Sequence, residues 1–220
     1  MMPPTATYDE IKAYQRDVEK NKITPHSLPL CSRCRSDSKF FKVHAYRERC
    51  FLIIVEMIVR KIFCPLIRFK CPGCGKTVTF YPDFAIPHKR YTRQTIEGFA
   101  TTYLAPATTY KQALMVEHEA PGYPDLDAAL APSTVHRWIT SLSQMPQICS
   151  KALEFLLQAS VPTPVCRDLA AWQPEKRKFR SERRKQQLIE CRRLSMLEVL
   201  FQVTFKTSIF TKLAIRHAFG

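Results

Sequence analysis

Glycine is scarce in this chain, with 5 glycines against 16 prolines among 220 residues. Flexible linkers are rich in glycine and serine, whereas proline stiffens the backbone, so we expect stiff connections between small modules. The sequence also has no internal repeat and no low-complexity tract. Its length then predicts two compact units and a helical tail.

Long uncharged apolar runs are missing as well. The most apolar stretch, residues 50–67, contains Glu56, Arg60, Lys61 and Pro65, whereas a membrane-spanning helix needs about 18 or more nearly uncharged residues. No signal peptide is recognisable, and an odd number of cysteines, 9, fits a reducing compartment better than an oxidised secreted scaffold. We therefore expect a cytoplasmic protein with no membrane partner.

Acidic residues are few relative to basic ones. The chain has 19 Asp and Glu against 34 Lys and Arg, a formal net charge of +15. The surplus is concentrated in residues 174–193, which carry nine basic and three acidic side chains, and in residues 88–93. Because Lys and Arg that neutralise phosphates release condensed counterions, this distribution favours nucleic acid as a partner. Solvated helix faces or an acidic protein surface are the alternative interpretations.

Two Cys-x-x-Cys pairs are the strongest functional motif. Cys31 and Cys34 form the first and Cys71 and Cys74 the second, with 36 residues between the pairs. Each such turn presents two thiolates to one ion, and Zn²⁺ prefers four tetrahedral ligands of this kind, so the pairs predict one structural Zn²⁺ per chain. Reduced core cysteines or a redox pair are the alternatives, although no thioredoxin-like pattern surrounds either pair.

The residues between the pairs must fold back, because they outnumber the roughly 15–20 of the commonest zinc spacing. We take charged clusters at 47–49 and 60–61 as breaks between strands. The β-forming segments predict two or three antiparallel strands between the pairs and one strand after them, at 40–46, 51–55, 62–69 and 77–81. Such a zinc ribbon buries too little apolar surface to fold without metal, so chelation should unfold it.

The segment 131–142 has the pattern of a recognition helix. Pro132 ends the preceding element, and Ser133 can cap a new helix by accepting a hydrogen bond from a backbone amide. The apolar stripe is Val135, Trp138, Ile139 and Leu142, and the polar residues elsewhere are Thr134, His136, Arg137 and Ser141. In a helix-turn-helix the stripe packs on a partner helix while polar residues reach bases and phosphates. An amphipathic helix that only packs is the alternative.

Helical patterns cover most of the remaining chain, at 8–20, 92–104, 109–118, 148–157 and from 176 or 181 to 205. Residues 121–130 exceed the usual three- or four-residue turn before a recognition helix, so either 125–130 form a short extra helix or the motif carries an insertion. Pro162 and Pro164 predict a hinge. The apolar stripe of the last helix is expected to pack within the chain, and pairing of two chains in a homodimer is the alternative.

Three short motifs follow one another in a recognisable order. The run Arg68–Thr77 holds the second cysteine knuckle, Tyr81–Tyr91 holds Pro-Asp-Phe and Pro-x-x-Arg-Tyr, and residues 132–138 read Pro-Ser-Thr-x-x-Arg-Trp. This order resembles the zinc-ribbon proteins of bacterial mobile elements over residues 28–145. The resemblance implies a DNA-binding accessory or regulatory protein, or the DNA-binding part of a transposase-like system, in a bacterial cytoplasm.

Catalysis is not expected. A transposase core holds three carboxylates around two Mg²⁺ ions in a strand-rich fold of about 100–150 residues. The acids available are Asp83, Asp125, Asp127, Asp168 and Glu175. They do not follow apolar strands in the required way, and nothing local supports Cys166 as a nucleophile with His136 or His217.

The sequence therefore predicts an α+β protein in four segments. They are an N-terminal helical extension at 1–27, a small β-rich zinc ribbon with four cysteine ligands at 28–87, a mainly helical helix-turn-helix-like domain at 88–160 and a basic helical tail at 161–220. The expected function is zinc-dependent, sequence-specific binding of double-stranded DNA, as an accessory or regulatory factor of a mobile element, with a transposase or other mobile-element protein as a further partner.

Two groups of residues are expected at the DNA. Bases or adjacent phosphates are assigned to Ser133, Thr134, His136 and Arg137, and the backbone to Lys89, Arg90, Arg93, Lys176, Arg177, Lys178, Arg180, Arg183, Arg184 and Lys185. One competing hypothesis is an RNA binder in which Tyr81 or Phe84 stacks on unpaired bases. Another is a protein-interaction adaptor in a transposition complex.

Overall fold

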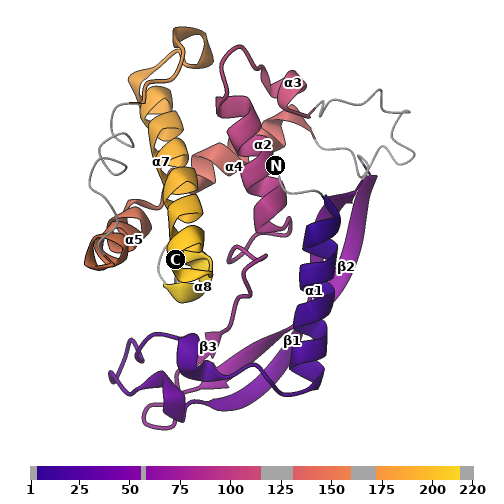
Figure 1. Ribbon diagram of the computed structural model, residues 1–220, viewed down its shortest axis with the longest axis vertical. Coiled ribbons are helices and arrows are strands. Elements are labelled where there is room, and N and C mark those ends of the chain that lie inside the picture. The colour runs from indigo at the N-terminus through magenta and orange to yellow at the C-terminus, as the bar shows by residue number, and fades with distance from the viewer. Residues whose placement is uncertain (1–3, 56–57, 115–130, 160–171, 214–220) are drawn as a thin grey trace. The chain divides into compact units, whose positions relative to one another are not determined.

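The protein is represented by a computed structural model (Figure 1), which describes residues 4–55, 58–114, 131–159 and 172–213. The chain forms two compact units. The sheet unit comprises residues 1–94 with 210–220, and the helical unit comprises residues 95–209. Since one unit is built on an antiparallel sheet and the other on helices, the expected α+β class is confirmed.

A long β-hairpin is the frame of the sheet unit. Strands β1 (Lys42–Val55) and β2 (Ile58–Lys70) pair antiparallel, and β3 (Thr77–Thr79) pairs with the other edge of β2. The register places Lys42 opposite Lys70. The hairpin therefore returns the chain to its starting point, so the segment before β1 and the segment after β2, which carry the two cysteine pairs, lie next to each other.

The charged clusters at 47–49 and 60–61 do not break the strands, and that expectation is wrong. Both clusters lie inside the continuous pairing of β1 with β2. Arg47, Glu48 and Lys61 are exposed. An antiparallel hairpin can pack one face on a core and leave the other in water, so charged side chains need not end a strand.

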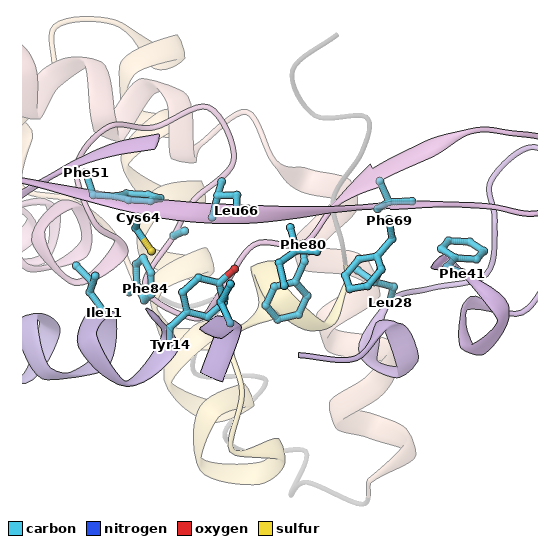
Figure 2. Packing of buried hydrophobic residues seen from close by; sticks show 14 of the residues in the cluster. Ile11, Tyr14, Leu28, Phe41, Phe51, Cys64, Leu66, Phe69, Phe80 and Phe84 are labelled. Atoms are coloured by element: carbon cyan, nitrogen blue, oxygen red, sulfur yellow. The ribbon is translucent and has the colours of Figure 1, made fainter. Parts of the chain in front are cut away.

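Helix α1 (Pro4–Glu19) belongs to the sheet unit and runs along the hairpin (Figure 1). Its residues Ile11, Tyr14 and Val18 are buried at the three- and four-residue spacing of one helix face. Figure 2 shows Ile11 and Tyr14 pointing toward the hairpin, where the Tyr14 and Phe84 rings meet edge to face with centroids 5.7 Å apart. Burial of Ile11 alone contributes about 1.5–3 kcal/mol, so α1 is part of this core.

The helical unit is built around the long helix α7 (Glu182–Phe205). Helices α4 (Pro132–Leu142) and α5 (Pro146–Gln158) pack against α7, and α3 (Tyr110–Leu114) contacts α4. Most of α2 (Arg93–Leu104) also belongs to this unit, whereas the short α8 (Ile209–Lys212) falls almost entirely within the residues of the sheet unit. The buried face of α7 is formed by Leu188, Cys191, Leu194, Leu197 and Phe201. Its apolar stripe thus packs within the chain, as expected.

The two sequence-predicted helix starts behave differently. Helix α4 begins at Pro132 with Ala131 as its N-cap and no capping side chain, so the expectation that Ser133 caps it is wrong. Proline suits the first helical position because its missing N–H has no partner to lose there. Helix α7 does have a side-chain cap, since the Ser181 hydroxyl accepts a hydrogen bond from the amide of Arg184 at 3.2 Å.

The four segments expected from the sequence are thus arranged as two units. The helix within 1–27 shares the core of the sheet unit, and α7 packs on α4 and α5 instead of forming a separate tail. Residues 121–130, Pro162, Pro164, Cys166, Asp168 and His217 lie outside the described residues, as does the end of the helix expected at 109–118. In the described part of the chain, no helix is both long and apolar enough to cross a membrane.

Candidate metal centre and basic surface

The four cysteines of the two pairs come together at the open end of the hairpin. The sulfur atoms of Cys31, Cys34, Cys71 and Cys74 all lie within 4.8 Å of one another. The Sγ atoms of Cys31 and Cys74 are 3.5 Å apart, as are those of Cys34 and Cys71. Zinc–sulfur bonds of about 2.3 Å in a tetrahedron place sulfurs about 3.8 Å apart. The cluster therefore has the dimensions of a four-thiolate metal site.

The two knuckles have the same backbone geometry. In the first, the amide of Arg35 donates to the carbonyl of Cys31 at 2.9 Å, and in the second the amide of Gly75 donates to the carbonyl of Cys71 at 2.9 Å. Arg35 and Gly75 both have a left-handed backbone, with φ of 63° and 73°. Each Cys-x-x-Cys turn thus points both thiols to the same side, which is how local sequence builds half of the site.

Backbone amides prepare the first knuckle for thiolates. Amides of Cys34 and Arg33 donate to the Cys31 sulfur and lower the pKa of Cys31 to about 6. The Ser36 hydroxyl and amide lower the pKa of Cys34. At Cys74 the Lys76 amide also favours the thiolate, but burial and the neighbouring cysteine sulfurs outweigh it and raise the pKa to about 11. Four thiolates in one place need a cation, so metal binding releases protons here.

The other described cysteines are ordinary core or partly buried thiols. Burial raises the pKa of Cys64 and of Cys191 to about 12, and that of Cys149 to about 11. Cys50 is partly buried. Among the described residues, the two pairs form the only group of at least three cysteine, histidine or acidic side chains close enough to hold a metal ion.

In the helical unit, the recognition-helix segment and the basic segment 176–185 line one cavity of about 690 Å³. Helix α4 contributes His136 and Thr140, and the basic segment contributes most of the remainder. The full lining is Tyr103, Thr108, Thr109, Tyr110, His136, Thr140, Arg177, Lys178, Phe179, Arg180, Ser181, Arg183, Arg184 and Gln187. These described lining residues include five Lys or Arg and no carboxylate, so the cavity is suited to an anion.

Lys178 and Glu175 anchor the basic segment to the end of α2. The Lys178 ammonium donates to the backbone carbonyls of Tyr103 and Ala105 and lies 4.9 Å from the centroid of the Tyr103 ring. The Glu175 carboxylate accepts from the amide of Ala107 at 3.3 Å. Lys178 is only 8% exposed. Its expected role at the DNA backbone is therefore wrong, because its charge is used inside the protein.

Arg184 joins three elements below the surface. Its guanidinium donates to the Thr140 hydroxyl of α4 at 3.1 Å, to the Tyr110 hydroxyl of α3, and to the Gln187 side chain within α7 at 2.8 Å. Arg184 and Lys185 are half-buried, and Lys185 pairs with Glu182 at 3.3 Å. Arg184 therefore fixes the position of the cavity wall as well as adding charge to it.

The remaining predicted residues of this unit face solvent to different degrees. Thr134 is half-buried and accepts a hydrogen bond from the Arg137 guanidinium at 3.1 Å. The exposed residues are Ser133, His136, Arg137, Lys176, Arg177, Arg180 and Arg183. Sequence reasoning missed Tyr103, Tyr110 and Phe179 as lining residues. Their position next to the basic segment depends on how distant parts of the chain pack, so no local pattern in the sequence shows it.

The second basic cluster is part of the sheet unit and is largely structural. Arg93 is buried and its Nε donates to the carbonyl of Asp83 at 2.6 Å, so its expected contact with DNA is wrong. Lys89 is half-buried, which lowers the pKa of its ammonium. Arg90 is exposed, and its carbonyl accepts from the amide of Leu52 at 2.8 Å.

The aromatic residues expected to stack on RNA are not available in that form. Phe84 is buried and packs against Tyr14 and Phe51, so its expected stacking role is wrong. Tyr81 is half-buried, with the Arg49 guanidinium 5.8 Å from its ring centroid. Of the two alternatives, Phe84 is therefore excluded, and stacking on Tyr81 stays a prediction.

Comparison with known proteins gives one match. Residues 31–138, just under half of the chain, match the model of a domain of unknown function (DUF6431). The match begins at the first cysteine of the metal centre and ends at Trp138 in α4, so it includes all four cysteines and the first two thirds of the recognition-helix segment. No curated protein and no solved structure matches the chain.

Proposed function

We propose that the chain is a zinc-dependent protein that binds double-stranded DNA and serves as an accessory or regulatory factor of a mobile genetic element. One observation carries the DNA part: α4 and the basic segment, which are far apart in sequence, line the same cation-rich surface of the helical unit. A surface lined by five Lys or Arg and by no carboxylate residue attracts polyanions at long range and gains free energy by releasing their counterions.

Helix α4 has the exposure that base reading requires. Its apolar residues Val135, Trp138, Ile139 and Leu142 are buried, while Ser133, His136 and Arg137 are exposed. A helix held by one face presents the other to the major groove, where short polar side chains and arginine meet base edges and phosphates. Phosphate contacts then come from the exposed arginines of the basic segment.

Zinc is the metal that best fits the four-thiolate cluster, because soft thiolates and tetrahedral spacing favour it over hard cations such as Mg²⁺ or Ca²⁺. All four positions are filled by protein ligands, which is the pattern of a structural site and leaves no open position for chemistry. We assign the ion to holding the knuckles and the hairpin together, and no catalytic role is part of the proposal.

A salt-titrated binding assay on full-length, zinc-loaded protein tests the DNA role. Arg180→Ala with Arg183→Ala should weaken binding to every duplex alike and flatten the salt slope by about 1 per arginine. Lys20→Ala with Lys151→Ala is the matched control, because both lysines are exposed and neither lines the cavity. If both double variants lose affinity equally, net charge and not this surface explains binding.

Two further arms separate the competing functions. Arg137→Ala should relax sequence preference among duplexes selected from a random pool, whereas the arginine pair should not. Single-stranded RNA that displaces duplex DNA at equal concentration would favour the RNA binder. The link to a mobile element rests on motif order, and recovery of transposon-end sequences in the selection would support it.

A further inference from the structure

We propose that the cavity in the helical unit binds one nucleotide, with the base against its aromatic wall and the phosphate on Arg180 and Arg183. The proposal deepens the DNA-binding function and rests on it in one respect: the expected source is an unpaired nucleotide of the bound DNA. A free mononucleotide has the same chemistry, and the experiment separates the two sources.

The size of the cavity argues for more than a phosphate. Its volume of about 690 Å³ lies within the range of about 300–1,000 Å³ that is typical of small-molecule sites. Contacts to the backbone of a paired duplex need only exposed cations on a surface, as in proteins that bind DNA through phosphates alone. A hollow of this volume has room for a base and sugar as well.

An aromatic wall gives the base a place to stack. The rings of Tyr103 and Tyr110 are parallel, with centroids 3.9 Å apart and planes 6° apart. The His136 ring lies 5.9 Å from Tyr110 at 55°, and all three residues line the cavity. Tyr103 is buried and covers one face of Tyr110, so the stacking surface is Tyr110 beside His136. Since every base has a flat aromatic face, such a surface binds bases with little sequence preference.

The chemistry of His136 fits a base better than a second phosphate. Partial burial and the nearby Arg184 charge lower the pKa of His136 below its usual 6.5. The imidazole is therefore neutral at pH 7, and a neutral ring can stack or exchange a hydrogen bond with a base edge. The cationic side of the cavity lies on the basic segment instead.

Two arginines remain for the phosphate. Arg177 pairs with Glu175 at 2.7 Å, while Lys178 and Arg184 donate to groups of the protein. The side chains of Arg180 and Arg183 have no hydrogen bond or ion pair with another residue that the structure describes. Both residues line the cavity, and an arginine can bind phosphate oxygens in a bidentate geometry.

The test uses full-length, zinc-loaded protein in two assays. Calorimetry compares deoxyadenosine monophosphate, deoxyadenosine and inorganic phosphate as ligands. Competition binding compares a fully paired duplex with the same duplex carrying one unpaired nucleotide. We expect the monophosphate to bind at least tenfold more tightly than either fragment, and the unpaired nucleotide to improve duplex affinity about tenfold.

Variants locate the effect. Tyr110→Leu should remove the preference for the unpaired nucleotide, and Tyr110→Phe, which keeps the ring, should retain it. Arg180→Gln should weaken binding of the monophosphate about tenfold. Because Arg180 is exposed, this variant keeps the test valid if Tyr110→Leu fails to fold. Phe155→Leu is the control, since Phe155 is an exposed aromatic residue on α5 outside the cavity.

The outcomes distinguish this proposal from the DNA-binding function. Duplex binding with no preference for the unpaired nucleotide and no monophosphate binding overturns the nucleotide site and leaves DNA binding in place. Monophosphate binding that depends on Tyr110 and Arg180, without duplex binding, supports the site with a free nucleotide as its source and overturns the DNA-binding function. Binding of neither ligand overturns both.

Discussion

The side chain of Lys178 donates a hydrogen bond to the backbone carbonyl of Tyr103, 75 positions earlier in the chain. It donates a second to Ala105, so one ammonium group closes the end of α2 against the start of the basic segment. Carbonyls at a helix C-terminus lack partners within the helix, and a lysine is suited to satisfy them because they carry partial negative charge. This contact holds in place the start of the basic segment, which carries the exposed arginines.

Removing the Lys178 ammonium should destabilise the helical unit. In Lys178→Met the stem still fills its space, but the carbonyl of the buried Tyr103 loses its donor, which costs about 1–3 kcal/mol for a buried unsatisfied group. Urea unfolding followed by fluorescence measures the change. Lys176→Met is the control, because Lys176 is exposed in the same short turn and should change the free energy of unfolding by less than about 0.5 kcal/mol. Equal effects of the two changes would refute the anchoring role.

The equivalent turns of the two knuckles predict opposite effects of two substitutions. Gly75 has φ of 73°, and an added Cβ would meet only Lys70 Cε at 3.7 Å, so Gly75→Ala is strained by its backbone alone. We expect a loss of about 1–2 kcal/mol. Arg35 occupies the same conformation with φ of 63°, so Arg35→Gly should relieve a similar strain. Unfolding curves of the zinc-loaded variants check both predictions. A Gly75→Ala variant as stable as the wild-type protein would contradict the predicted backbone strain.

The buried thiols predict a pH dependence. Burial raises the pKa of Cys64 and Cys191 from 9.0 to about 12. In the unfolded chain these thiols release protons near pH 9, whereas the folded chain keeps them until about pH 12. The free energy of unfolding should therefore fall as pH rises through this window. Mass spectrometry after iodoacetamide treatment at about pH 8, where thiolate reactivity decides labelling, should find both cysteines unmodified in the native protein and modified in urea.

Much of the sheet unit could be predicted from sequence because its signals are local. The Cys-x-x-Cys turns, the β-forming runs and the small residues around Cys71–Cys74 each determine nearby geometry, and the hairpin register then brings the pairs together. The continuity of β1 and β2 through their charged clusters was missed, since the pattern cannot show which face of the hairpin stays in water.

The helical unit was predicted less completely because its site depends on long-range packing. The helices themselves follow from their apolar periodicity, and α2, α4, α5 and α7 begin and end near the expected residues. The burial of Lys178, however, depends on a backbone carbonyl at the end of α2, and that of Arg93 in the sheet unit depends on the carbonyl of Asp83. A basic residue in sequence does not reveal whether its charge meets solvent or a carbonyl, so these two positions were assigned to DNA in error.

Metal removal should unfold the sheet unit. In Cys71→Ser the hydroxyl is a far weaker zinc ligand than a thiolate, so we expect zinc content to fall well below one per chain. Because metal binding in small zinc modules supplies folding free energy directly, thermal unfolding should shift to lower temperature by many degrees. Cys50→Ser is the matched control: Cys50 lies in β1 of the same unit, partly buried and outside the cluster.

Acid should act like chelation at this site. Protonation of the cysteines competes with the metal, so zinc content measured after dialysis should fall as pH is lowered, and the loss should be reversed by returning to neutral pH with added zinc. A wild-type protein that keeps its unfolding temperature after chelation, or a Cys71→Ser variant that matches Cys50→Ser in zinc content and stability, would contradict a structural metal. Because α1 shares its core with the hairpin, loss of its helical signal in circular dichroism should accompany release of the ion.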